Sequence, residues 1–203
     1  MVKSKLTNEE NFMKSQIVGT ADDAFAYLKQ LSASLHVESI AKVVLNNESF
    51  PLWSATSNYG VHHYGKGGLV IHTAEVTKLC LDVNQYYKLD ESKVFLAALF
   101  HDIGKVWDYA PKDQYYTWAA TSHKYKIHHI SRSASIWQEA SIKLSQEFRD
   151  EVFHAILAHH GRREWGSPVT PASKLAWLLH LCDCMSARMD DTVDDTVDDT
   201  VEV

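Results

Sequence analysis

Apolar residues recur at helical spacing over most of the chain, and capping residues and glycines separate these stretches. The pattern predicts a succession of helices rather than alternating strands. With their caps included, we expect helices at about residues 7–18, 20–32, 38–45, 69–87, 91–104, 129–144, 146–160 and 171–189. The predicted fold class is therefore all-α.

One short stretch departs from this helical pattern. Residues 106–109 (Val-Trp-Asp-Tyr) and 115–118 (Tyr-Tyr-Thr-Trp) are rich in β-prone residues, and Ala-Pro-Lys-Asp-Gln separates them. This predicts one short β-hairpin, which is the only strand signal along the chain. An irregular loop rich in aromatic residues is expected at residues 51–68.

The chain ends in an acidic repeat, Asp-Asp-Thr-Val in three copies followed by Glu-Val. The last fourteen residues carry seven acids and no base, so 20 bases face 19 acids (26 minus 7) in the rest of the chain. A surface that binds polyanions over the whole molecule is therefore not indicated. We expect residues 1–60 to be helices packed on the core, residues 61–189 to form the functional domain and residues 190–203 to be a disordered tail.

The composition is that of a globular protein, with 45% apolar and 23% charged residues. The N-terminus lacks the apolar segment of a signal peptide, and no apolar run reaches the length of a membrane span. We therefore expect a cytoplasmic protein without membrane contact. The three cysteines are odd in number and lie in apolar helical segments, so reduced core thiols are expected.

The most apolar predicted helix ends in a histidine and an aspartate, His101-Asp102. Adjacent imidazole and carboxylate groups suit a divalent metal ion, since imidazole binds Zn, Fe or Ni and carboxylate binds Mg or Mn. Such a pair often arises by chance. It indicates a metal site only if further ligands lie at workable places in the chain.

Such residues are present at helix ends and on apolar helical faces, where a polar group needs a partner. They are His72, His129, the pair His159-His160 and Asp183. Asp183 is the most informative, because it lies in an apolar segment where a lone buried carboxylate requires a cation. A salt bridge to an arginine or lysine would also satisfy it. Taken together, the positions predict a metal site assembled from distant parts of the chain.

Longer segments surround these positions: Gly68-Leu-Val-Ile-His72, Leu99-Phe-His-Asp-Ile-Gly-Lys105, His129-Ile130, Leu157-Ala-His-His-Gly161, Glu164-Trp-Gly-Ser-Pro168 and Leu179-His-Leu-Cys-Asp183. Their content and order resemble the HD superfamily of metal-dependent phosphohydrolases. Within it, they are most similar to the HD domain of YhaM-type 3′→5′ exoribonucleases. The resemblance covers residues 61–189 and implies an HD-domain helical bundle.

The resemblance also implies divalent metal ions as cofactors, two in number and drawn from Mn, Mg, Ni, Co or Fe. His72, His101, Asp102 and Asp183 would hold the first ion. Asp102 would bridge this ion to the second.

The second ion would be held by His129, His159 and His160, which resemble the additional ligands of HD proteins with two metals. The sequence leaves open which of His159 and His160 faces the site, because neighbours on a helix diverge by about 100°. His128 could replace His129, although His129 fits the family's His-Ile pair better.

Basic residues near these ligands are candidates for binding a substrate phosphate. Lys105 follows the His-Asp pair, so Asp102 and Lys105 are the candidate catalytic residues. Arg162 and Arg163 could bind a second phosphate, and His62 and His63 could reach the mouth of the site. Each of these basic residues could instead be a solvated charge.

The function implied is that of a phosphodiesterase that attacks a nucleotide, cyclic nucleotide, short oligonucleotide or RNA 3′ end with a metal-activated water. The alternatives are a nucleotide phosphomonoesterase or dNTP hydrolase, a di-iron HD oxygenase and a non-catalytic nucleotide-binding module. YhaM-type enzymes carry an OB-fold domain that guides nucleic acid. The first sixty residues here are too few and wrongly patterned for one, which favours a nucleotide or short oligonucleotide as substrate.

Overall fold

The computed structural model describes residues 14–59, 61–112 and 117–189. Helices dominate these parts, which confirms the predicted all-α class. The helices are α1 (Ala21–Ser34), α2 (Glu38–Leu45), α3 (Gly68–Tyr87), α4 (Glu91–Phe100), α5 (Lys105–Asp108), α6 (Ser122–Lys126), α7 (His129–Ala140), α8 (Gln146–Ala158) and α9 (Lys174–Arg188), with a 3-10 turn, η1, at Arg163–Trp165.

Polar side chains cap several of these helices. The Thr20 side chain accepts a hydrogen bond from the Asp23 amide and the Asp23 carboxylate accepts one from the Thr20 amide, which forms a capping box for α1. Ser145 and Ser173 accept amide hydrogen bonds at the starts of α8 and α9. Because Ser173 is the cap, α9 begins at Lys174, later than predicted.

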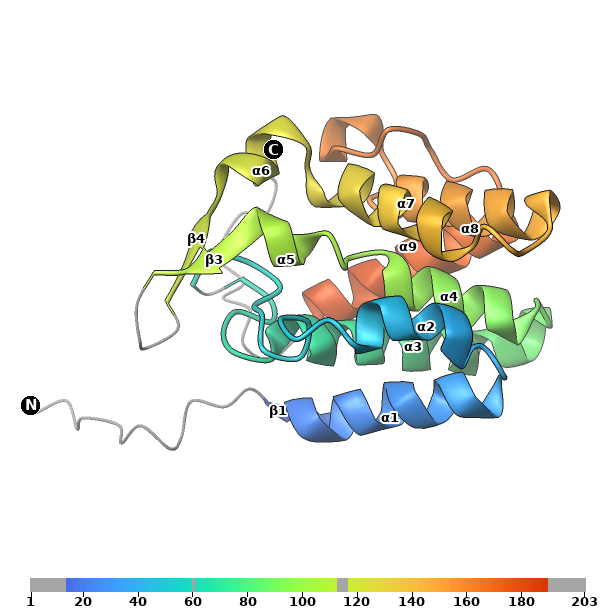
Figure 1. The fold of residues 1–203 in the computed structure, drawn as a ribbon, viewed down its shortest axis with the longest axis horizontal. Helices are drawn as coiled ribbons and strands as arrows, with labels where there is room; N and C mark the ends of the chain where they lie inside the picture. Colours follow the sequence, from blue (N-terminus) through green and yellow to red (C-terminus); the bar gives the residue numbers. More distant parts are fainter. Residues whose placement is uncertain (1–13, 60, 113–116, 190–203) are drawn as a thin grey trace, which may run out of the picture.

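The long helices pack in layers around one apolar core (Figure 1). Helix α1 lies along one edge, α3 and α4 run through the middle, and α7 and α8 cover the other side. Helix α3 contacts α1, α4 and α9, while α8 contacts α4, α7 and α9. Phe100 and Trp137 meet edge-on in this core, with ring centroids 5.3 Å apart. Full burial of one such side chain stabilises the fold by about 1.5–3 kcal/mol.

The predicted first helix is wrong in its described part. Lys14–Ser15 (β1) and Gly19–Thr20 (β2) form an antiparallel hairpin instead. The Ser15 hydroxyl accepts hydrogen bonds from the amides of Ile17 and Val18, and this local bonding competes with a helix. Residues 7–13 of that prediction lie outside the described residues.

The hairpin expected after the His-Asp pair is present but shifted. It pairs β3 (Tyr109–Pro111) with β4 (Trp118–Ala120). Residues 105–108, partly predicted as strand, form α5, because the turn after α4 continues helically from the Lys105 amide bonded to the Asp102 carbonyl. Helix α6 was not predicted, and α4 and α7 end about four residues earlier than expected.

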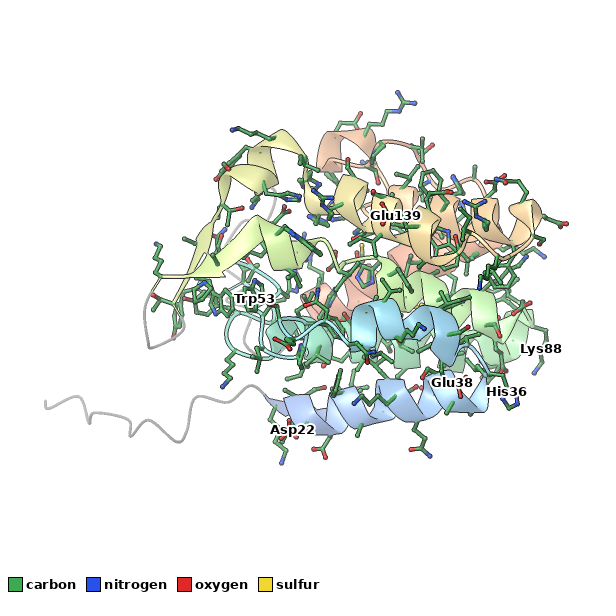
Figure 2. All side chains as sticks on the ribbon, viewed as in Figure 1. Asp22, His36, Glu38, Trp53, Lys88 and Glu139 are labelled. Carbon is green, nitrogen blue, oxygen red and sulfur yellow. The ribbon has the colours of Figure 1, made fainter. Side chains whose placement is uncertain are left out.

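Trp53 attaches this hairpin to the loop before α3. Its indole N–H donates to the Tyr109 carbonyl at 2.8 Å, and its ring meets Trp118 edge-on at 5.3 Å. Figure 2 shows Trp53 at the hairpin end of the molecule, with His36 and Lys88 at the opposite end.

Other expectations have mixed outcomes. Cys80, Cys182 and Cys184 are free thiols, the first two buried. Among the described residues, no helix combines the length and the apolar character needed to cross a bilayer. The acidic tail at residues 190–203 lies outside the described residues.

Candidate metal centre

The structure gathers the seven predicted ligands in one place. They come from helices far apart in the sequence, and most lie where a helix begins or ends. They are His72 in α3, His101 and Asp102 after α4, His129 at the start of α7, His159 and His160 after α8, and Asp183 in α9.

The first group of donors consists of His72, His101 and Asp183, whose ligand atoms lie within 4.8 Å of one another. His72 Nε2 is 3.0 Å from Asp183 Oδ1 and 3.3 Å from His101 Nε2. Asp102 Oδ2 lies 3.4 Å from the Nε2 atoms of both histidines. These four side chains are therefore close enough to share one cation.

The second group consists of His129, His159 and His160, whose ligand atoms also lie within 4.8 Å of one another. Asp102 reaches this group with its other oxygen, Oδ1, which is 3.5 Å from the Nε2 atoms of His129 and His159. His129 Nε2 is 3.2 Å from His160 Nε2. The Asp102 carboxylate thus faces one donor group with each oxygen.

Two buried atoms at this junction show that the residues fit a metal ion. Asp102 Oδ1 and His159 Nε2 have no hydrogen-bond partner within the described residues. Buried polar atoms nearly always have a partner, since leaving one unmet is costly. Imidazole nitrogen and carboxylate oxygen are both ligands of divalent transition metals.

Both histidines of the His159-His160 pair face the centre, which the sequence left open. Helix α8 ends at Ala158, and both rings reach the centre from the turn that follows it. His129 likewise contributes its Nε2, while the ring of half-buried His128 lies beside it at a tilt, with ring centroids 4.1 Å apart.

All five histidines of the centre use Nδ1 for a hydrogen bond and turn Nε2 inward. Three of the Nδ1 partners are backbone carbonyls and one is a carboxylate, which can only accept, so these Nδ1 atoms carry the proton. The fifth partner is a serine hydroxyl that already donates elsewhere. The pairs are His72 with Ser186, His101 with Ala98 O, His129 with Asp108, His159 with Ile156 O and His160 with Trp165 O.

Asp108, which sequence reasoning missed, supports His129 from behind. Its Oδ2 accepts from the His129 amide at 2.9 Å and contacts His129 Nδ1 at 3.1 Å. Its Oδ1 lies 2.6 Å from His123 Nδ1. Asp108 is 0% exposed, and its place within the predicted strand at residues 106–109 gave no signal of this role.

Glu75 and Ser186, also missed, support His72. The Ser186 hydroxyl lies 3.0 Å from His72 Nδ1 and donates to Glu75 Oε2 at 2.7 Å. Glu75 also accepts from the Ser15 hydroxyl and pairs with His63 Nε2 at 2.9 Å. Although burial opposes ionisation, the hydrogen bond from His63 lowers the pKa of Glu75 to about 2.

Burial and charge divide the histidines into two kinds. At His72, burial disfavours protonation, but hydrogen bonds to Asp102 and Asp183 outweigh it and raise the pKa to about 9. At His129 and His160, burial lowers the pKa, to about 3 for His160. The carboxylates therefore favour a positive charge beside His72, while His129 and His160 are neutral imidazoles, the form that binds metal.

Asp102 is ionised although it is almost completely buried. Desolvation raises its pKa, but the nearby Lys105 ammonium and His101 more than offset this and hold the pKa well below its usual range. Lys105 Nζ lies 2.8 Å from Asp102 Oδ2. The centre thus has a stable anion at its middle.

A cavity of about 290 Å³ opens onto the centre. Asp102, His129, His160 and Asp183 contribute to its wall together with Lys105. Its polar and aromatic lining also includes Lys124, His128, Arg188, Tyr109 and Trp165.

Several candidate substrate-binding residues lie elsewhere. Arg162 and Arg163 are exposed and do not line the cavity; the Arg162 guanidinium lies over the Trp165 ring instead. His63 is 1% exposed and is turned toward Glu75, while its neighbour His62 lines the cavity. The loop conformation, with His63 at φ 55°, decides which of the two histidines faces inward.

Replacing Asp108 by alanine is expected to lower divalent-metal affinity about 10- to 100-fold, the usual effect of removing a group that orients a metal-binding histidine. His129 would lose the acceptor for both its amide and its ring N–H. Isothermal titration calorimetry would measure the change. Asp108→Asn keeps one acceptor oxygen and should recover part of the affinity; an unchanged Kd in Asp108→Ala would contradict this role.

The sequence was also compared with protein families and with known proteins. The HD domain family matches residues 69–188, more than half of the chain. The 3′-5′ exoribonuclease YhaM of Shouchella clausii (strain KSM-K16) is 27% identical over 159 residues, which are 76% of this chain and 49% of the relative. The chain thus spans about half the length of this curated relative. No solved structure was found to match. The extent of the family match, with the paired histidine and aspartate at its centre, shows that the chain belongs to the HD domain family.

Proposed function

We propose that the chain is a metal-dependent phosphodiesterase that cleaves a nucleotide, cyclic nucleotide or short oligonucleotide, including an RNA 3′ end. The observation that carries this proposal is the Asp102 carboxylate, which faces one group of three donors with each oxygen. Membership of the HD family supports a metal-dependent hydrolase. The activity of the YhaM relative supports a nucleic-acid substrate.

We assign one divalent ion to His72, His101, Asp102 and Asp183. The imidazoles of His129, His159 and His160 would hold a second ion, and the Asp102 carboxylate lies within reach of both groups. This mixture of nitrogen and oxygen donors suits Mn, Fe, Co or Ni, whereas Mg prefers oxygen ligands and water.

When bound, the ions supply an acidified water and neutralise charge on the phosphate oxygens. The side chains of the cavity bind and orient the substrate. Lys105 Nζ, beside Asp102 Oδ2, presents a positive point charge to a phosphate oxygen. Lys124 and Arg188 line the same cavity, and the planar guanidinium of Arg188 can hold two phosphate oxygens at once.

A metal-supplemented substrate screen tests the proposal. The purified chain would be incubated with Mn, Mg, Co, Ni or Fe(II) and with mononucleotides, dNTPs, cyclic nucleotides and short RNA or DNA. Chromatography of the products would follow. Release of a mononucleotide from a diester is the expected result. Release of phosphate from mononucleotides alone, oxygen consumption without hydrolysis, or binding without turnover would each contradict it.

Replacing both Lys124 and Arg188 by alanine should raise the KM for a phosphodiester about tenfold or more, because each charged hydrogen bond contributes about 1.5–3 kcal/mol. Metal affinity should stay the same. A matched double variant, Lys126→Ala with Arg163→Ala, removes exposed charges outside the cavity and should leave the KM unchanged. Equal effects of the two double variants would argue against phosphate binding by Lys124 and Arg188.

A further inference from the structure

Trp165 lines the cavity of the metal centre and yet keeps 46% of its surface exposed. Large aromatic rings normally bury most of their surface, so this ring leaves apolar area beside the metal donors for a ligand to cover. Trp177 provides a comparison within the same chain. It is 50% exposed and its ring also lies about as close to His180, but it does not line the cavity.

The backbone of Trp165 is tied directly to the metal centre. Its carbonyl accepts a hydrogen bond from His160 Nδ1 at 2.8 Å, and Nε2 of the same ring belongs to the second donor group. The turn closes at Gly166, whose φ of 86° is readily reached only by glycine and whose amide donates to the Arg163 carbonyl at 3.0 Å. The position of Trp165 relative to the donors is therefore fixed by the fold.

Two other side chains lie near the ring of Trp165. The Arg162 guanidinium lies 4.9 Å from its centroid, and the His180 ring lies 6.3 Å away. An indole side chain has only two rotatable bonds, so it loses little conformational freedom when a planar ligand stacks on it. Its exposed surface is thus suited to binding another flat, π-rich group.

We propose that Trp165 is a nucleobase-binding residue, on which an unpaired base of the substrate stacks while the adjoining phosphate lies at the metal centre. This inference rests on the proposed function and specifies its substrate class. Stacking of a base on an aromatic side chain contributes about 1–3 kcal/mol and tolerates any base. Lys105, Lys124 and Arg188 line the cavity for the phosphate, so base and phosphate have separate partners.

The cavity volume limits what accompanies that base. About 290 Å³ lies at the lower end of the range of roughly 300–1,000 Å³ for small-molecule sites. This size is compatible with a small part of a nucleic-acid chain next to the metal donors, and stacking on Trp165 requires a base that is not paired. The substrate class is a phosphodiester with an unpaired base next to the bond that is cleaved.

The test compares a short single-stranded substrate with the same molecule lacking the terminal base, using the metal-supplemented full chain. Trp165→Ala should raise KM about 5- to 150-fold for the base-bearing substrate, as expected from the stacking energy. The KM for the abasic substrate should stay the same, and kcat should be nearly unchanged for both substrates. Trp165→Phe should restore most of the loss, and Trp177→Ala should behave as the wild type.

A second measurement does not depend on turnover. Titration with adenosine 5′-monophosphate should quench tryptophan fluorescence in the wild type and in Trp177→Phe, but much less in Trp165→Phe, whereas ribose 5-phosphate should quench none of them. Equal KM changes for both substrates, or equal quenching in both Phe variants, would overturn the inference. If no diester is cleaved but the quenching difference persists, the proposed function fails and base binding stands.

Discussion

Alanine in place of Asp102 is expected to abolish metal binding and turnover together while the helices remain folded. The carboxylate reaches both donor groups, with Oδ2 3.4 Å from His72 Nε2 and Oδ1 3.5 Å from His129 Nε2. Its removal therefore weakens both proposed ion sites at once. The loss of metal affinity should exceed the roughly 10- to 100-fold effect of removing an outer orienting group.

The metal content of the purified variant, calorimetric titration and circular dichroism would check this expectation. Asp102→Asn preserves the shape of the side chain but not its charge, so it should also lose metal while packing normally. Asp82→Ala removes a surface acid of α3 that pairs with Lys78, and it should bind metal as the wild type does. Two equivalents of tightly bound metal in Asp102→Ala would refute the shared-carboxylate arrangement.

Gly104→Ala is expected to destabilise the fold strongly, although Gly104 has an ordinary helical backbone with φ −61°. An added Cβ would lie 2.2 Å from the carbonyl oxygen and 2.7 Å from the Cα of His129. These are backbone atoms, so the start of α7 must move away. Overpacking of this kind costs about 1–3 kcal/mol and sometimes more. The shift would also carry His129 away from the metal centre.

Gly166→Ala is the matched control for that variant. Its φ of 86° imposes a strain of about 1–2 kcal/mol on alanine. However, the nearest neighbouring atom to its added Cβ is 3.7 Å away. Thermal unfolding and metal titration should show a larger loss of stability and of metal affinity in Gly104→Ala than in Gly166→Ala. Equal melting temperatures for the two variants would show that α7 can adjust.

The sequence predicted the parts of the structure that depend on local signals. Thr20 and Asp23 form a capping box that is recognisable from the sequence, and the helix that it caps is present. Ser15 lies in a stretch whose sequence predicted a helix. Its hydroxyl donates to Glu75, sixty residues away, and no neighbouring residue in the sequence indicates that contact. Local patterns cannot register such a partner.

The same distinction applies to the candidate metal centre. His101 and Asp102 were recognisable as adjacent donors, whereas Asp108 and Glu75 looked like ordinary acids in helical or strand segments. Their importance comes from contacts with residues 21 and 111 positions away, respectively. The path of the loops decides which basic side chains line the cavity. The spacing of residues in the sequence does not predict that path.

The inward-facing rings of the centre have a thermodynamic consequence. Because every Nδ1 is anchored to protein, no ring can swivel toward an incoming ion without breaking a hydrogen bond. The rotational entropy of these side chains is lost when the chain folds, not when the ion arrives. Discrimination among metals then depends on ionic radius and preferred coordination geometry, since a rigid frame cannot reshape itself around a poorly fitting ion.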